Sequence, residues 1–297
     1  MPEPIVCTPK LLPRHKWQSA AKIATEINPV NHPPVERLVR IVAGFSPTPE
    51  HISVLTTKYW GVAGLRLTVG FLDNPPADLR ARILSHMNAW SRTANVTFVD
   101  SKTEPKVRIA RQGGQQGGYW SYLGTDILSI DRDQPTMNLE AFTMNMPESE
   151  FHRVVRHETG HTMGFPHEHM RRELVDEIDP DKAIAYFGAT QGWSAAEVRQ
   201  QVLTPIEESS LRGTAHADPD SIMCYQIPGS ITKDGKSIIG GLDIDRQDFA
   251  FAALIYPKVA KPKVAPKRKA KAKSKGKTVR KSKVKRSSGR KKMMRSV

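Results

Sequence analysis

The 297-residue chain has little cysteine and no long apolar run. Its two cysteines, Cys7 and Cys224, exclude a disulfide scaffold, and neither lies in a CxxC zinc pattern. No apolar run reaches the roughly 18 residues of a membrane span, and the N-terminus lacks the apolar core of a signal peptide. We therefore expect no membrane span and a cytoplasmic location by default, with non-classical export left open.

Acidic residues are absent from the segment 258–297, which holds 19 of the 45 Lys and Arg residues. Residues 1–257 carry 26 basic and 30 acidic side chains, so the net charge of +15 comes from the C-terminal segment. Its low-complexity, apolar-poor composition predicts a disordered basic tail. A polycation releases counterions from phosphate backbones, so the tail could bind nucleic acid; it could equally be a solubilising segment without a chosen partner.

The remaining chain divides into a proline-rich N-terminal extension of unknown role, 1–59, and a regular region, 60–257. In that region strand patterns fall at 64–73, 95–100, 106–111 and 136–142, and helical patterns at 77–92, 147–164 and from 194 onward. A last helix through 245–255 is expected, with Asp243 as its cap. A strand, a crossover helix and further strands predict a mixed α/β (α+β) domain, with a twisted mixed sheet and helices packed against it.

The stretch GGQQGGYWSYLG, residues 113–124, combines glycines with alternating aromatic residues. A glycine-led aromatic strand suits a sheet edge where another backbone comes close, whereas a surface loop is the alternative. A substrate strand could pair with this edge, backbone to backbone. The edge-strand residues are Gly117, Gly118, Tyr119, Trp120, Ser121, Tyr122 and Leu123.

The run HETGHTMGFPH, residues 157–167, indicates a metal site. His157 and His161 are four apart on a predicted helix, so both imidazoles can reach one ion. Gly164 lets the chain leave the helix, and His167 can return as a third ligand. Three protein ligands leave one zinc position open, which is typical of a catalytic site, and Glu158 could reach a metal-bound water there as general base. The expected cofactor is one catalytic Zn²⁺ ion.

HETGHTMGFPHEHMR resembles the zinc signature of the metzincin metallopeptidases, and Glu168 after the third histidine favours the astacin-like branch. SIMCY, residues 221–225, is similar to the family's methionine turn. The resemblance covers about residues 60–257. It implies that Met223 forms the floor of the site and that Tyr225 approaches the metal, where it could stabilise the oxyanion.

The chain departs from the family at three places. Cys224 stands where the family usually has histidine, and the secreted members' disulfides are missing. No maturation cleavage is evident that would give Glu168 a new N-terminus to bind, so Arg171 or Arg172 could be its partner. Cys7 could cap the zinc as a thiolate, as in the related matrixins, although its context IVCTPK does not match their switch motif.

The sequence therefore predicts a zinc-dependent metalloendopeptidase that acts on protein or peptide substrates. The alternative is a nucleic-acid-binding protein that uses the basic tail and retains a relic peptidase fold. The presence of ligands, base and turn methionine favours the first. Histidines outside the motif, among them His86 and His152, are expected to be solvated or hydrogen-bonded rather than ligands.

Overall fold

The computed structural model describes residues 7, 10–33, 35, 49, 53, 56–168, 172–205, 218–224 and 226–258. The expected disorder of the basic tail lies outside these residues, apart from Lys258. Among the described helices, none is long and apolar enough to cross a membrane.

A five-stranded mixed sheet forms one layer, with the strand order β2-β1-β3-β5-β4. Its strands are β1 (Leu65–Phe71), β2 (Val96–Asp100), β3 (Val107–Ala110), β4 (Tyr119–Ser121) and β5 (Met137–Leu139). β1, β2, β3 and β5 pair in parallel, and only β4 is antiparallel to its neighbour β5. In this strand order β4 is the last strand, so it lies at an edge of the sheet, as the glycine-led aromatic pattern predicts.

The crossover helix α4 (Ala77–Met87) joins the parallel strands β1 and β2. Its apolar residues recur at helical spacing, and Leu79, Ile83 and Met87 are buried against the sheet. The 3₁₀ helix η3 (Asn88–Arg92) extends it and buries Trp90. The order strand, crossover helix, strands and the mixed fold class are confirmed.

The other helices in the described residues are α1 (Trp17–Ile27), α5 (Glu148–Glu150), α6 (Arg156–Met163), α7 (Arg172–Val175), α8 (Pro180–Gln191), α9 (Ala195–Val198) and α10 (Arg246–Ile255). The π-helices η6 (Phe151–Val155) and η8 (Arg199–Leu203) follow α5 and α9, and the 3₁₀ helices are η1 (Arg14–Lys16), η2 (Pro29–Asn31), η4 (Gly114–Gln116), η5 (Gly124–Ser129) and η10 (Gly229–Ile231). α5, η6 and α6 are continuous, so the helix predicted at 147–164 is confirmed. Helix α8 was not predicted, although Asp179 caps it and Pro180 occupies its first turn.

The prediction that Asp243 caps the last helix is wrong. Asp245 is the N-cap of α10, and it forms a capping box with Asp248. Asp243 instead accepts a hydrogen bond from Arg156 at 2.5 Å. Asp243 and Asp245 look equivalent as caps in the sequence, but only Asp245 directly precedes the first helical residue and accepts the N–H of Asp248.

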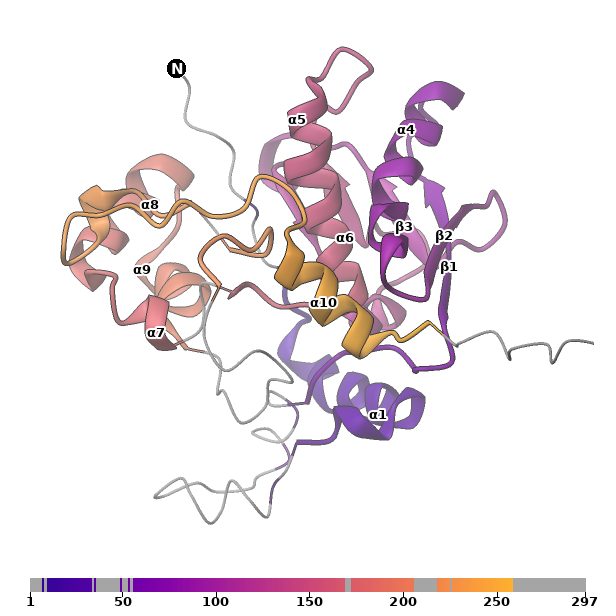
Figure 1. Cartoon of the computed structure of the whole chain (residues 1–297), viewed down its shortest axis with the longest axis horizontal. Coiled ribbons are helices and arrows are strands. Elements are labelled where there is room, and N and C mark those ends of the chain that lie inside the picture. The colour runs from indigo at the N-terminus through magenta and orange to yellow at the C-terminus, as the bar shows by residue number, and fades with distance from the viewer. Residues whose placement is uncertain are drawn as a thin grey trace, which may run out of the picture. The chain divides into compact units, whose positions relative to one another are not determined.

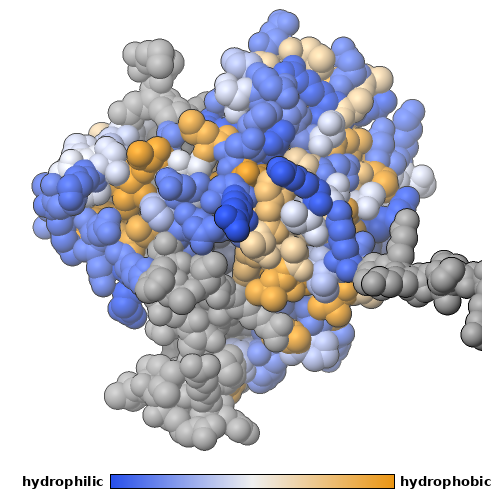
Figure 2. Space-filling view, viewed as in Figure 1, coloured by the Kyte–Doolittle hydropathy of each residue, from blue (hydrophilic) through white to orange (hydrophobic). Residues whose placement is uncertain are grey.

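The described residues form two clusters of buried apolar side chains. The larger is built by the sheet, α4, α6 and α10; the smaller unites α7, α8 and α9 with the segment 224–238. Figure 1 shows α7, α8 and α9 on one side of α6, and α4 with the sheet on the other. Apolar surface follows α10 on the face shown in Figure 2, in agreement with Leu254, which is 69% exposed.

The described part of the N-terminal extension packs against the rest of the fold. Helix α1 lies beside η5, and Lys16 Nζ donates to the carbonyl of Ser129 at 2.9 Å. Asn31 Nδ2 donates to the carbonyl of Tyr59 at 2.7 Å, and its Oδ1 accepts the N–H of Tyr59 at 3.0 Å. These residues therefore belong to the same compact unit as the sheet.

Candidate metal centre

Helix α6 carries the first two motif histidines, His157 and His161, one turn apart and both buried. The helix ends at Gly164, whose φ of 97° lies in the left-handed region that favours glycine. The chain then reverses, so that His167 returns to the same face. Its Nε2 lies 3.1 Å from Nε2 of His157 and 3.0 Å from Nε2 of His161. The structure thus brings the three predicted ligands together; we call them the motif cluster.

Backbone carbonyls orient two of these rings. Nδ1 of His157 lies 2.5 Å from the carbonyl oxygen of Ile222, and Nδ1 of His161 lies 2.8 Å from that of Phe165. A carbonyl only accepts hydrogen bonds, so each Nδ1 carries the proton and donates it. Both Nε2 atoms then present lone pairs toward Nε2 of His167. Burial also lowers the pKa of His161 to about 4, which favours its neutral, ligand-competent form.

Glu158, the predicted base, is fully buried beside the first histidine. Neither carboxylate oxygen has a hydrogen-bond partner among the described residues. Burial raises the pKa of Glu158 to about 8, while Cys7 and Arg153 lower it in part. A buried carboxylate without partners is costly unless it faces a group that the protein binds.

These observations fit a zinc ion. Converging imidazole lone pairs about 3 Å apart repel one another unless a cation lies between them. Zinc accepts neutral imidazole nitrogen as a ligand at about 2.0–2.1 Å. A metal-binding histidine usually donates its other ring N–H to a protein acceptor, which fixes its tautomer and the orientation of the ring. The buried Glu158 carboxylate could accept a hydrogen bond from a water molecule or from a group of the substrate.

Met223 lies beneath α6. A Cβ built on Gly160 would be 2.4 Å from Sδ of Met223, so the thioether occupies space that only glycine leaves free. The residue before it, Ile222, donates its N–H to Asp248 Oδ2 at 2.9 Å and offers its carbonyl to His157. The segment 221–224 is therefore anchored to α10 on one side and orients a ligand on the other.

Two predicted features stay only partly described. Tyr225 lies outside the described residues, so its approach to the metal stays a prediction. Glu168 Oε1 accepts the N–H of Asp218 at 3.2 Å, and the Glu168 N–H donates to the carbonyl of Met223 at 2.9 Å. These bonds tie the loop that carries His167 to the segment 221–224. Arg171, one suggested partner of Glu168, is outside the described residues.

The predicted edge strand, Gly117–Leu123, runs beside α6. Its central residues form β4, and Ser121 Oγ lies 3.1 Å from Oγ1 of Thr162, the neighbour of His161. The outer edge of β4, which has no strand of the sheet beside it, is occupied by the N-terminal extension. Cys7 forms a parallel bridge with Tyr119, and Lys10 forms one with Tyr122.

The thiol of Cys7 joins the motif cluster. Its Sγ lies 3.5 Å from Nε2 of His161, and the four ligand atoms of Cys7 and the three histidines lie within 4.8 Å of one another. No spacing in the sequence connects residue 7 to residues 157–167, so only the resemblance to the matrixins suggested Cys7 as a zinc ligand.

A second cluster combines His86, Glu148 and His152; we call it the His86 cluster. Nε2 of His86 lies 3.2 Å and Nε2 of His152 lies 3.4 Å from Glu148 Oε1. Arg156 Nε donates to Nδ1 of His86 at 3.3 Å. His86 then carries its proton on Nε2 and donates it to Glu148, so its hydrogen bonds are complete without an ion.

A helix bearing two histidines and a buried glutamate, closed by a third histidine and floored by a methionine, defines a zinc metallopeptidase of the metzincin class. Comparison with known proteins agrees. The family model for Astacin, a family of peptidases, matches residues 57–227. The chain therefore belongs to the astacin family, which confirms the resemblance found in the sequence.

Individual relatives support the same assignment. Zinc metalloproteinase nas-27 of Caenorhabditis elegans is 32% identical over 118 residues, which are 39% of this chain and 25% of that protein. The chain thus spans about a quarter of the length of this curated relative. A structure of myroilysin is 30% identical with a TM-score of 0.63 and covers 68% of this chain and 97% of its own. A crystal structure of myroilysin, also 30% identical, has a TM-score of 0.53 and covers 68% of this chain and 86% of its own.

Proposed function

We propose that the chain is a zinc-dependent endopeptidase in which His157, His161 and His167 hold one catalytic ion. The observation that carries this proposal is the convergence of three Nε2 atoms at 3.0–3.1 Å beside a buried, unpartnered carboxylate. A zinc ion held there supplies Lewis-acid polarisation of a water molecule and of the scissile carbonyl.

Glu158 moves the proton in this proposal. It removes a proton from the attacking water and delivers it to the leaving amine, because its buried carboxylate lies next to the first histidine of the motif cluster. The catalytic domain is assigned to residues 60–257.

The open edge of β4 provides the place for the substrate. A peptide that forms backbone hydrogen bonds with Gly117–Leu123 passes beside Thr162, and hence beside the metal ligand His161. The position of Tyr225, two residues after Met223, suggests that its hydroxyl donates a hydrogen bond to the developing oxyanion. Replacement by Phe should then lower kcat by roughly 10²-fold with little change in zinc content. An unchanged kcat would remove Tyr225 from the mechanism.

The decisive experiment combines metal analysis with proteolysis. Zinc content is measured in the purified full chain, and casein cleavage is followed with and without a chelator. Glu158→Gln keeps the shape of the side chain and removes the base, so zinc should stay bound while turnover falls to near background. A chain without zinc, or casein cleavage that persists in Glu158→Gln, would contradict the assignment.

A second function, polyanion binding by the segment 258–297, is favoured by its 19 basic residues and lack of acid. The slightly acidic body offers no comparable charge. Deleting 258–297 should remove DNA binding and its salt dependence, while cleavage of small peptides is retained. The same salt slope in the shortened protein would show that the body binds DNA instead.

A further inference from the structure

The C-terminal end of α6 has all of its carbonyl groups hydrogen-bonded. The last four carbonyls of an α-helix have no partner within the helix itself. In α6 these carbonyls belong to Gly160, His161, Thr162 and Met163. The N–H groups of Phe165 and Gly164, in the turn that follows, donate to the first two at 3.0 and 2.8 Å. The partners of the other two carbonyls come from distant parts of the chain.

Trp60 and Tyr256 supply these partners, and we call them the donor pair. Nε1 of Trp60 donates to the carbonyl of Thr162 at 2.9 Å, and the hydroxyl of Tyr256 donates to the carbonyl of Met163. The same hydroxyl accepts the N–H of Trp60 at 3.1 Å. A phenol has one proton to donate and a carbonyl has none, so the direction of each hydrogen bond is fixed.

The donor pair is buried. Trp60 is 5% exposed and Tyr256 is 0% exposed. Burial raises the pKa of Tyr256, so its hydroxyl keeps the proton that it donates. Loss of this hydroxyl would leave a buried carbonyl and a buried N–H without the partners that they have now, which is costly in a protein interior.

The backbone just before the donor pair's indole passes close to the end of α6. A Cβ on Gly164 would lie 2.9 Å from the carbonyl oxygen of Lys58, so a side chain there would force the two segments apart. The ammonium of Lys58 lies 3.8 Å from Asp126. Asn31 forms hydrogen bonds with both the N–H and the carbonyl of Tyr59. The indole is therefore carried by a backbone that is fixed on both sides.

The two carbonyls that the donor pair holds directly follow His161. Phe165, in the same turn, accepts the Nδ1–H of His161 at 2.8 Å. The ring centre of Phe165 lies 6.2 Å from that of Tyr256. The turn then leads to His167, so the donor pair holds the backbone that connects two of the proposed metal ligands.

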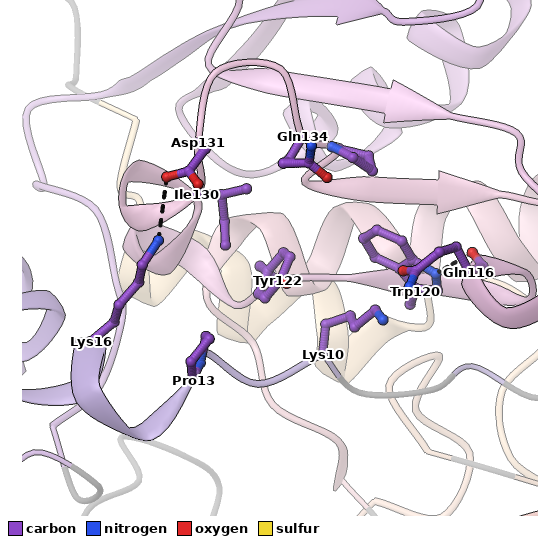
Figure 3. A pocket seen from close by; sticks show the side chains of 10 residues that line it. Lys10, Pro13, Lys16, Gln116, Trp120, Tyr122, Ile130, Asp131 and Gln134 are labelled. Atoms are coloured by element: carbon purple, nitrogen blue, oxygen red, sulfur yellow. Dashed lines mark hydrogen bonds and ion pairs between the residues drawn. The ribbon is translucent and has the colours of Figure 1, made fainter.

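The donor pair is separate from the proposed substrate edge. Figure 3 shows a cavity of about 160 Å³ beside β4, lined among other residues by Lys10, Trp120 and Tyr122. Neither Trp60 nor Tyr256 lines this cavity. A change in the donor pair should therefore act on the metal ligands and not on the groove in which a peptide would bind.

We propose that Trp60 and Tyr256 are positioning residues of the metal centre, which fix the turn that orients His161 and returns His167 by holding the last two carbonyls of α6. This inference rests on the proposed zinc site. The two residues are 196 apart in sequence and lie at opposite ends of the region 60–257. The zinc motif does not include them, because a motif specifies side chains and the groups held here are backbone carbonyls.

Tyr256→Phe tests the proposal, because it removes the hydroxyl and keeps the ring beside Phe165. In the full chain, the zinc dissociation constant measured by competition with a chelator should rise roughly tenfold or more. The visible absorption of bound Co²⁺ reports the geometry of its ligands and should change in shape or intensity. KM for a short peptide should stay within about twofold of the wild-type value, since the groove is unchanged.

Thr93→Val is the matched control. The Thr93 hydroxyl donates to the carbonyl of Phe249 in α10 at 2.8 Å, so its loss weakens the attachment of α10 without removing a donor from an α6 carbonyl. This variant should be less stable toward urea with chelator present, yet keep the zinc affinity and the cobalt spectrum of the wild-type protein. Equal losses of zinc affinity in Thr93→Val and Tyr256→Phe would overturn the proposal, as would a Tyr256→Phe protein with wild-type affinity and spectrum.

Trp60→Phe decides the question if Tyr256→Phe does not fold. It removes the donor to the Thr162 carbonyl and leaves the Tyr256 hydroxyl in place, so zinc affinity should fall and the cobalt spectrum should change as well. Wild-type zinc affinity in this variant would overturn the proposal. Failure of the wild-type chain to bind zinc or cobalt would instead overturn the proposed zinc site itself.

Discussion

The motif cluster and the His86 cluster both gather imidazole nitrogens within a few ångströms of each other. They differ in what surrounds the rings. Two motif histidines donate Nδ1 protons to carbonyls, which leaves lone pairs facing inward. In the other cluster Arg156 donates to His86, and Arg82 contacts Glu148 at 2.6 Å. Proximity of ligand types therefore does not define a metal site; the hydrogen bonds behind the rings and the neighbouring charges do.

The difference has an electrostatic side as well. The pKa of His86 is lowered to about 4, chiefly by burial; Glu148 opposes this shift, and Arg156, His152 and Arg82 contribute to it. The two arginines that complete the hydrogen bonds also repel a cation. We interpret the His86 cluster as a structural contact that joins α4, α5 and η6.

The largest effect should come from removing one histidine from each cluster. His157→Ala should lose bound zinc and peptidase activity, because two ligands remain where three are needed. His152→Ala should keep the zinc content of the wild-type protein. Metal analysis after dialysis measures both. Equal zinc loss in the two variants, or two zinc ions in the wild-type protein, would refute the distinction.

The next effect concerns the anchor behind the motif cluster. Asp248 accepts hydrogen bonds from the Ser221 hydroxyl at 2.6 Å and from the N–H groups of Ile222 and Asp245 at 2.9 and 3.0 Å. Asp248→Ala leaves these donors without acceptors and should cost about 2–4 kcal/mol of stability. Because Ile222 orients His157, zinc affinity should also fall by roughly 10-fold or more.

Urea unfolding and zinc competition with a chelator measure the two effects. Asp248→Asn is the matched control, since its amide keeps one acceptor oxygen and should lie between wild type and Asp248→Ala in both measurements. An Asp248→Ala protein with wild-type zinc affinity would show that the segment 221–224 holds its position without this anchor.

A smaller effect is expected at Gly160. The Cβ of alanine would lie 2.4 Å from Sδ of Met223 and 3.4 Å from the Trp90 ring. Relieving this overlap should cost about 1–3 kcal/mol, partly offset by the better helix propensity of alanine. Gly160→Ala combined with Met223→Ala should recover part of the loss, which thermal or urea unfolding detects. Additive losses in the double variant would exclude the contact as the cause.

Local features of the two clusters could be predicted from the sequence. The spacing of His157, Glu158 and His161 on one helix is local, so the structure brings them together as predicted. The position of β4 was predicted from glycines followed by alternating aromatic residues. The end of the helix at Gly164 was predicted from the glycine that commonly terminates helices. Their roles in catalysis stay predictions that the variants above test.

Spacing along the chain did not predict contacts between distant segments. Cys7 and His161 are 154 residues apart, and only a resemblance to related proteins suggested that Cys7 lies near the metal ligands. Helix α8 was missed because its cap and proline were not read together, and Asp243 was preferred to Asp245 because capping depends on backbone geometry. The His86 cluster joins residues from three elements, so only the fold could show that its histidines share one carboxylate.

The smallest expected effect is the pH dependence that His86 gives to stability. Its pKa is lowered in the folded protein from 6.5 to about 4, chiefly because burial disfavours the charged ring. The unfolded chain therefore takes up a proton first as the pH falls, so stability is complete above pH 6.5 and is lost toward pH 4. The attraction of Glu148 for the protonated ring opposes the shift. About 1 kcal/mol of stability should therefore be lost between roughly pH 7 and pH 5.5. His86→Gln cannot titrate but can still accept from Arg156 and donate to Glu148, so its unfolding free energy should fall less over this range. Urea unfolding of both proteins with chelator present removes the contribution of metal release, and equal slopes against pH would show that His86 is not the group responsible.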